Sequence, residues 1–165
     1  MDADHGARTS DELTFRRATD DDAPAIGDVW LASFRSAYDF PPAHPDEDVR
    51  QWLRNEVVPK TETWVAVESG GEVVGFMSLR DDDLDHLYVH PTWFGRGIGS
   101  RFIEIAKERR PRGLGLWTFQ VNDRARGLYE RRGFVAERFT DGVSNEEHQP
   151  DVRYVWRPSE GGEDA

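Results

Sequence analysis

Three glycines at alternate positions, Gly95, Gly97 and Gly99, separate a predicted β-strand, residues 84–90, from a predicted helix, residues 97–109. Glycine allows backbone conformations in which consecutive amides converge on one point, and the start of a helix favours negative charge. The junction therefore predicts a cradle for a phosphate group. This strand-loop-helix unit constrains the fold more than any other part of the sequence.

Two well-known phosphate-binding loops do not fit this spacing. A Walker loop requires Gly-Lys-Ser/Thr after four intervening residues, and the segment lacks it. A dinucleotide-binding fingerprint that starts at Gly95 requires Gly or Ala at position 100, where Ser100 stands. One that starts at Gly97 requires the same at position 102, where Phe102 stands. Both classes of loop are therefore excluded.

Hydrophobic spacing predicts the remaining helices and strands. The predicted helices are one with Ile26, Trp30, Phe34 and Ala37, a short one with Val49, Trp52 and Leu53, and those at 97–109 and 124–132. The predicted strands cover residues 13–18, 63–67, 73–79, 84–90, 114–121, 134–139 and 152–156. This order, β α α β β β α β α β β, indicates a mixed α/β sheet with helices on its faces.

The two ends of the chain, residues 1–12 and 158–165, are polar and acidic and predict flexible tails. The residues between them, 13–157, predict a single domain, as expected for a chain of 165 residues. No run approaches the ~20 apolar residues that span a bilayer, and the N-terminal segment does not resemble a signal peptide. We therefore expect no membrane partner and a cytoplasmic location.

Composition narrows the chemistry further. The formal net charge of -11 at pH 7 disfavours nucleic acid as a partner and favours cationic ligands. The absence of cysteine excludes disulfides, thiolate zinc sites and a cysteine nucleophile. We expect no metal cofactor, and the sequence leaves homodimer formation open.

The residues around the glycine loop resemble the acetyl-CoA motif of the GNAT superfamily of N-acetyltransferases. In that motif a hydrophobic strand and a proline turn precede Gln/Arg-x-x-Gly-x-Gly/Ala at the start of a helix. The matching residues are Leu87, Tyr88, Val89, His90 and Pro91, followed by Phe94, Gly95, Arg96, Gly97, Ile98 and Gly99. Phe94 departs from the motif, because Gln or Arg usually stands there. A second family segment, Asn-x-x-Ala-x-x-Leu-Tyr-x-x-x-Gly-Phe, matches Asn122, Ala125, Leu128, Tyr129, Gly133 and Phe134.

The resemblance implies an α/β fold with a mixed, mostly antiparallel central sheet, helices on both faces and splayed strands at the cofactor site. It also implies that the pantetheine arm of acetyl-CoA pairs with the strand at 87–89, while the pyrophosphate lies on Gly95 to Gly99. Arg96 is expected beside the phosphates. The residues expected to bind the cofactor are Leu87, Tyr88, Val89, Phe94, Gly95, Arg96, Gly97, Ile98, Gly99, Ser100 and Asn122.

Direct acetyl transfer to an amine, without an acyl-enzyme, requires a base for the amine and an acid for the departing thiolate. Tyr129 occupies the position that usually supplies the acid in this family. Some relatives carry a carboxylate base where Trp117 stands here, so we favour Asp85 or His86 as the base, with Asp83 behind them. Strand alternation places both aspartates on the face opposite His86, and a bulge would change that parity.

The family's usual acceptor site lies between the first helices and the loop before the last strand, here residues 37–56 and 141–151. Both segments are rich in acidic residues, and Trp52 could add a cation–π surface, so we expect a cationic amine of a small molecule or peptide. A polyamine, an aminoglycoside, a lysine side chain and a protein N-terminus all remain open. The alternative function is a non-catalytic acyl-CoA sensor, because its phosphate cradle would look the same.

Overall fold

The computed structural model describes residues 12–159, and the predicted tails lie outside these residues except at their inner ends. The sheet has seven strands in the order β1-β2-β3-β4-β5-β7-β6, and every neighbouring pair is antiparallel except β4 and β5. This confirms the predicted mixed, mostly antiparallel sheet. The strands are β1 (Thr14–Arg17), β2 (Glu62–Val67), β3 (Val73–Arg80), β4 (Asp83–Val89), β5 (Leu114–Phe119), β6 (Val135–Phe139) and β7 (Asp151–Trp156).

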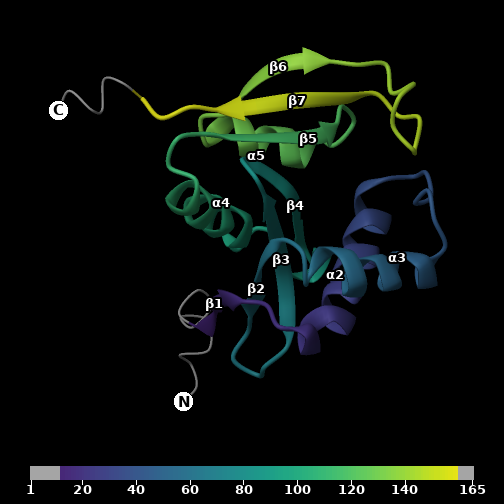
Figure 1. The fold of residues 1–165 in the computed structure, drawn as a ribbon, viewed down its shortest axis with the longest axis vertical. Helices are drawn as coiled ribbons and strands as arrows, with labels where there is room; N and C mark the ends of the chain where they lie inside the picture. The colour runs from purple at the N-terminus through teal and green to yellow at the C-terminus, as the bar shows by residue number, and fades with distance from the viewer. Residues whose placement is uncertain (1–11, 160–165) are drawn as a thin grey trace.

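Helices cover both faces of the sheet, with α2 and α3 on the side opposite α4 (Figure 1). Asn122 ends the strand that was predicted to reach Val121, because its backbone N–H turns back to the Phe119 carbonyl at 3.0 Å. The helical segments are η2 (Asp20–Asp22), α2 (Ala23–Ala37), α3 (Asp46–Trp52), the π-helical η3 (Leu53–Val57), η4 (Pro91–Trp93), α4 (Ile98–Arg109) and α5 (Asp123–Arg131). Within the described residues, none of these helices is long and apolar enough to cross a membrane.

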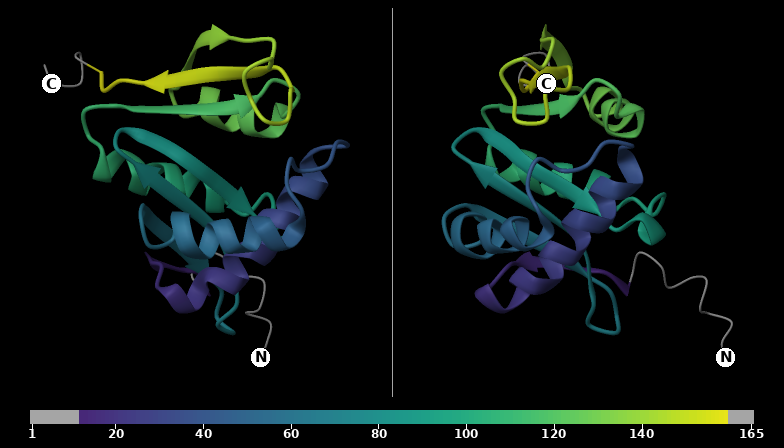
Figure 2. Two further views of the ribbon diagram at one scale, coloured as in Figure 1. Left: turned by 45° about the vertical axis from the view of Figure 1, so that its right-hand side comes forward. Right: turned by 90° about the vertical axis from the view of Figure 1, so that its right-hand side faces the viewer.

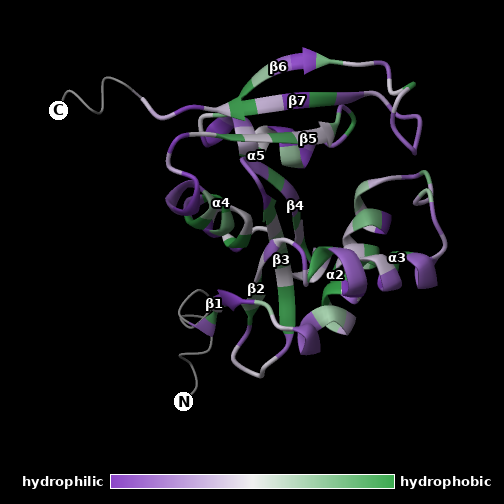
Figure 3. Ribbon diagram, in the orientation of Figure 1, coloured by the Kyte–Doolittle hydropathy of each residue, from purple (hydrophilic) through white to green (hydrophobic). Residues whose placement is uncertain are grey.

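Two hydrophobic clusters hold the helices to the sheet. Phe76 on β3 is fully buried against α2, whereas its neighbour Met77 is fully buried on the α4 side. The hydropathy colouring follows this division, with apolar residues along β3 and polar residues along the outer loops (Figure 3). Burial of one large apolar side chain stabilises a fold by about 1.5–3 kcal/mol, so each cluster fixes the helix that contributes to it.

A bulge interrupts β4 at Asp85. Ser78 of β3 pairs with His86, but the next residue, Leu79, pairs with Leu84, so Asp85 has no partner on β3. In consequence Leu84 and Leu87 lie in the same hydrophobic cluster, although they are three residues apart. The strict alternation of the sequence prediction therefore does not hold here, and the bulge is the physical reason.

Strands β4 and β5 meet only at their beginnings. Their single pair is Asp83 with Gly115, and beyond it β4 continues with β3 while β5 continues with β7. Figure 2 shows the two strands side by side at one end and diverging toward the other. Arg153 of β7 joins both Asp83 carboxylate oxygens at 2.9 Å and so closes the narrow end of this splayed region.

Gly115 is needed where this ion pair crosses β5. A Cβ at position 115 would lie 2.1 Å from Arg153 Nη2 and 3.0 Å from Asp83 Oδ1. We predict that Gly115→Ala displaces the guanidinium and lowers the free energy of unfolding by about 1–2 kcal/mol, between the values for exposed and buried pairs. Urea denaturation measures this change. An equal loss in an Arg153→Ala background would show that the ion pair is not the cause.

Candidate active site

The glycine loop presents a row of unpaired backbone amides. Gly95 and Gly97 have φ of 80° and 82°, the left-handed region that favours glycine, and Gly97 is the N-cap of α4. A Cβ at either position would meet nothing within 4 Å, so backbone conformation rather than space explains both glycines. Within residues 12–159, the amides of residues 95–100 make no hydrogen bond. They are available to an anion at the start of α4.

Gly99 serves a different purpose from the other two glycines. A Cβ there would lie 2.9 Å from Leu128 Cδ2, so Gly99 lets α5 approach the first turn of α4. The amide oxygen of Asn122 accepts the N–H of Ala125 at 3.1 Å and caps the start of α5. The first turn of α4 therefore lies against α5, whose own start is capped by Asn122.

A cavity of about 230 Å³, here called the loop cavity, opens beside this junction. It brings together most of the residues predicted to bind the cofactor, from β4, the glycine loop and α5. Its lining residues include Leu87, Val89, Phe94, Gly95, Gly97, Ile98, Gly99, Ser100, Asn122 and Tyr129. Ser33 and Ala37 of α2 complete one side, which the sequence prediction did not include.

Two of the predicted cofactor residues lie elsewhere. The Tyr88 ring stacks on Trp30 and Phe76, with centroids 5.7 Å apart in both cases, on the α2 side of the sheet. The Arg96 guanidinium lies 4.5 Å from the centre of the Trp93 ring, and Arg96 lines a separate hollow with Phe15. Neither residue is among those that line the loop cavity, and their contact with the cofactor stays a prediction.

The basic side chains of the loop cavity come from α5 instead. Arg124 and Arg131 both line it, and the Arg124 guanidinium lies 4.2 Å from the centre of the Phe94 ring. The sequence prediction missed these residues because they follow Asn122 on a helix that had been considered only for Tyr129. Helical spacing could have found them, since Arg124, Leu128 and Arg131 recur at intervals of three to four residues.

Tyr129 lies where the loop cavity meets a second one. Its side chain is only 7% exposed and contacts the rings of Phe134 and Tyr154. Its hydroxyl makes no hydrogen bond within the described part of the chain. Burial, with a smaller contribution from Tyr38, raises the pKa of Tyr129 above its ordinary value, so the hydroxyl keeps its proton at neutral pH.

The second cavity, of about 110 Å³ and here called the strand cavity, lies between the splayed strands. Asp85 reaches it from the bulge of β4, and Trp117 and Thr118 reach it from β5. Arg80 Nε donates to Asp85 Oδ2 at 2.9 Å, which leaves Oδ1 without a partner among residues 12–159. Asp85 is therefore the predicted base that faces a cavity.

Tyr38, at the end of α2, also lines the strand cavity. Its hydroxyl accepts a hydrogen bond from Asn122 Nδ2 at 2.8 Å, so one asparagine side chain contacts both α2 and α5. Burial, partly offset by this hydrogen bond, raises the pKa of Tyr38. The sequence prediction missed Tyr38, because only the fold brings it near a residue 84 positions away.

His86, the other predicted base, lies on the α3 side of the sheet. Its ring contacts the rings of Trp52 and Phe76, and its Nδ1 is 2.7 Å from Ser78 Oγ. Burial lowers the pKa of His86 to about 4, with Arg80 adding to the effect. His86 is not among the residues that line the loop or strand cavity in the described chain, so the structure does not bring it together with Tyr129.

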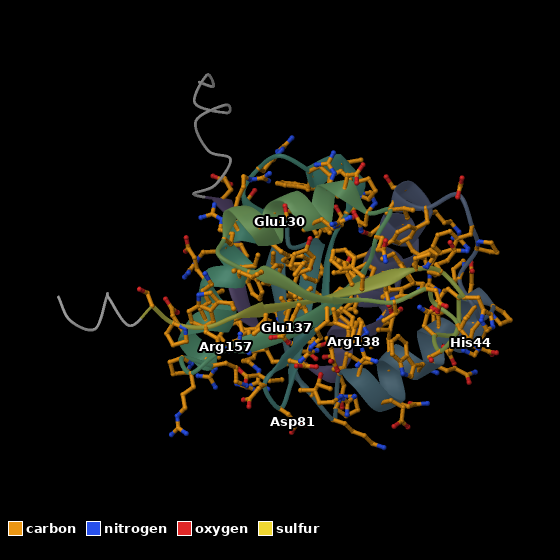
Figure 4. All side chains as sticks on the ribbon, turned by 90° about the horizontal axis from the view of Figure 1, so that it is seen from above. His44, Asp81, Glu130, Glu137, Arg138 and Arg157 are labelled. Atoms are coloured by element: carbon orange, nitrogen blue, oxygen red, sulfur yellow. The ribbon has the colours of Figure 1, made fainter. Side chains whose placement is uncertain are left out.

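The two acidic segments predicted to admit the acceptor lie side by side. His44, between α2 and α3, contacts both carboxylate oxygens of Glu146, between β6 and β7, at 3.2 Å. Figure 4 shows His44 beside the β6–β7 loop. Trp52 lies farther along, against His86, so its part in cation binding stays a prediction.

Comparison with known proteins agrees with this geometry. The family described as "Acetyltransferase (GNAT) domain" matches residues 59–136. Peptidyl-lysine N-acetyltransferase YjaB of Salmonella typhimurium is 30% identical over 122 residues, which cover 74% of this chain and 83% of that protein. Peptidyl-lysine N-acetyltransferase YiaC of Escherichia coli is 30% identical over 120 residues, covering 72% of this chain and 81% of that protein.

Solved structures show the same fold. The solution structure of apo-form YjaB from Escherichia coli matches with a TM-score of 0.74 at 24% identity, covering 89% of this chain and 99% of that one. The PaiA N-acetyltransferase of Thermoplasma acidophilum, solved in complex with coenzyme A, matches with a TM-score of 0.65 at 15% identity, covering 88% of this chain and 99% of that one. The chain belongs to the GNAT superfamily and is an acetyl-CoA-dependent N-acetyltransferase. The predicted family is thus confirmed.

The lowered pKa of His86 has a consequence for stability. The unfolded chain protonates His86 as the pH falls below its ordinary pKa of 6.5, whereas the folded chain protonates it only near pH 4. The stability that neutral His86 contributes is therefore complete above pH 6.5 and is lost as the pH falls toward about 4. The difference corresponds to about 3 kcal/mol. We predict that His86→Gln, which cannot titrate, shows a smaller fall in unfolding free energy between these pH values. Urea melts at several pH values measure it, and parallel curves for both proteins would contradict the prediction.

Proposed function

We propose that this protein transfers the acetyl group of acetyl-CoA directly to the side-chain amine of a lysine in a peptide or protein. The observation that carries the proposal is the meeting of the loop cavity and the strand cavity. The residues that line both are Ser33, Ala37, Leu87, Asn122, Ala125 and Tyr129. A donor on one side and an acceptor on the other would meet beside Tyr129, so no acyl-enzyme is required.

The donor belongs on the loop side. The free amides of residues 95–100 suit a pyrophosphate at the start of α4. Beyond Asp83, the edge of β4 that faces β5 has no strand partner among residues 12–159, so an extended amide-containing chain can pair with it. The pantetheine arm of acetyl-CoA has that form, and it would carry the acetyl group toward Tyr129.

The acceptor belongs on the strand side. At about 110 Å³ the strand cavity is small beside the roughly 300–1,000 Å³ of pockets that enclose drug-sized molecules. An unbranched alkyl amine fits such a space better than an aminoglycoside, and the Asp85 carboxylate suits its positive charge. The names of the relatives YjaB and YiaC, both peptidyl-lysine N-acetyltransferases, favour a lysine side chain over a free polyamine.

The same residues supply the acid and base. A lysine amine has a pKa of about 10.4, so it must lose a proton before it attacks the acetyl carbon. Asp85, with Oδ1 free, takes that proton directly or through water, and a backbone amide near Val89 stabilises the developing negative charge on the acyl oxygen. Tyr129 then protonates the thiolate. Burial raises the pKa of Tyr129, so the hydroxyl carries a proton at neutral pH, and the same burial raises the proton affinity of the thiolate beside it.

Polar groups at the junction favour an enzyme over a sensor. A module that only recognises acyl-CoA needs the glycine loop, but it has no use for a carboxylate and a free hydroxyl at the acyl position. Asp85 lines the strand cavity from β4, and Tyr129 lines it from α5. We therefore prefer catalysis to sensing.

A panel of amines tests the acceptor. We expect peptides with one internal lysine and a blocked N-terminus to release coenzyme A thiol at least tenfold faster, in kcat/KM, than spermidine or a peptide with only a free α-amine. Mass spectrometry should place the acetyl group on the lysine Nε. A preference for spermidine would overturn the lysine assignment, and no turnover with any amine, despite acetyl-CoA binding, would favour the sensor.

Tyr129→Phe separates binding from chemistry. The ring contacts should remain, so we predict an unchanged coenzyme A dissociation constant and a kcat lower by about 10²–10⁴, the usual effect of losing a general acid. Tyr154→Phe is the matched control, because its hydroxyl contacts Arg126 and Glu130 and it lines neither cavity. Equal kcat for the two variants would contradict the role of Tyr129, as would equal losses in binding and turnover.

A further inference from the structure

Arg124 is the one cationic side chain of the first turn of α5 that faces the loop cavity in the described structure. The central carbon of its guanidinium, Cζ, lies 4.2 Å from the centre of the Phe94 ring. Two arginines near it have partners, because Arg126 donates to Tyr154 Oη at 3.0 Å and Arg132 donates to Ser100 Oγ at 2.8 Å. Arg124 makes no hydrogen bond or ion pair with any residue in 12–159.

The position of Arg124 is electrostatically unfavourable without an anion. The N-terminus of a helix carries partial positive charge, so a cation in the first turn of α5 is repelled by it. The start of α4 lies at the same cavity, because its N-cap Gly97 also lines it. Two helix starts and a free guanidinium thus share one space. Asp123, beside Arg124 in the sequence, is the acidic residue of this first turn, and it is not among the residues that line the cavity.

Phe94 explains how Arg124 is held. An aromatic face attracts a guanidinium and restricts its orientation while leaving the N–H groups free for another partner. Position 94 is also where the resembling motif usually carries Gln or Arg. Arg96, the basic residue expected from sequence to be near the phosphates, instead lies on Trp93 in a different hollow.

We propose that Arg124, positioned by the Phe94 ring, binds the pyrophosphate of the acyl donor and supplies from α5 the contact that residue 94 does not make. This inference rests on the proposed donor site. A guanidinium can donate two parallel hydrogen bonds to a phosphate, and these would add to the hydrogen bonds from the amides of the glycine loop. Arg124 is therefore a binding residue of the donor and takes no part in proton transfer.

Three ligands distinguish the phosphate that Arg124 binds: coenzyme A, dephospho-coenzyme A, which lacks the 3′-phosphate, and pantetheine, which has no phosphate. For Arg124→Gln we expect calorimetric dissociation constants for the first two to rise roughly tenfold to a hundredfold, as for loss of a charged hydrogen bond. Pantetheine affinity should not change. The matched control, Arg112→Gln, removes the same charge from an exposed turn and should leave all three affinities unchanged.

Each other outcome overturns the proposal. Unchanged coenzyme A affinity would show that Arg124 makes no contact. A loss confined to coenzyme A would assign Arg124 to the 3′-phosphate, and an equal loss for pantetheine would indicate a structural role. Gly97→Asp tests the donor site separately, because a carboxylate there would repel a phosphate on the loop. If that variant also binds coenzyme A normally, the donor site itself is wrong rather than Arg124 alone.

Discussion

The parting of β4 from β5 after one residue pair is the constraint on which the rest of the site depends. A sheet that continued its pairing beyond Asp83 and Gly115 would close both the strand cavity and the free edge of β4. The ion pair of Asp83 with Arg153 holds the narrow end, and the absence of a side chain at Gly115 makes room for it. The bulge at Asp85 then turns a carboxylate into the opening. Local irregularities in two strands thus produce the site within an otherwise regular sheet.

The fold was largely predictable because its signals are local. Alternating or helical spacing of apolar residues marks each element. Glycines at positions 95 and 97 indicate positive φ values, which the structure has at both residues. The splayed strands were expected from the resemblance to the family rather than from local spacing. Element ends shifted by one or two residues where a hydrogen bond, such as that from the Asn122 amide to Phe119, determined the stop.

Side-chain placement was less predictable because it depends on contacts between distant segments. Nothing near Arg96 in the sequence indicates that Trp93 draws its guanidinium away from the loop cavity, or that Phe94 retains Arg124 from another helix. The choice between Asp85 and His86 turned on a bulge, which strand periodicity does not reveal. Tyr38 could be placed near the site only from the fold, which brings the end of α2 next to the start of α5. Which of these residues act in catalysis stays a prediction.

The two hydrogen bonds of Asn122 tie together elements on the two sides of the junction. Its oxygen holds the start of α5 and its nitrogen holds Tyr38, so α5 cannot shift without straining the end of α2. If a ligand in the loop cavity favours one position of α5, the same position of Tyr38 is favoured in the strand cavity. Linkage then requires the two affinities to depend on each other by the same factor in both directions. A single amide group thereby makes the coupling between the two substrate sites a property of the architecture.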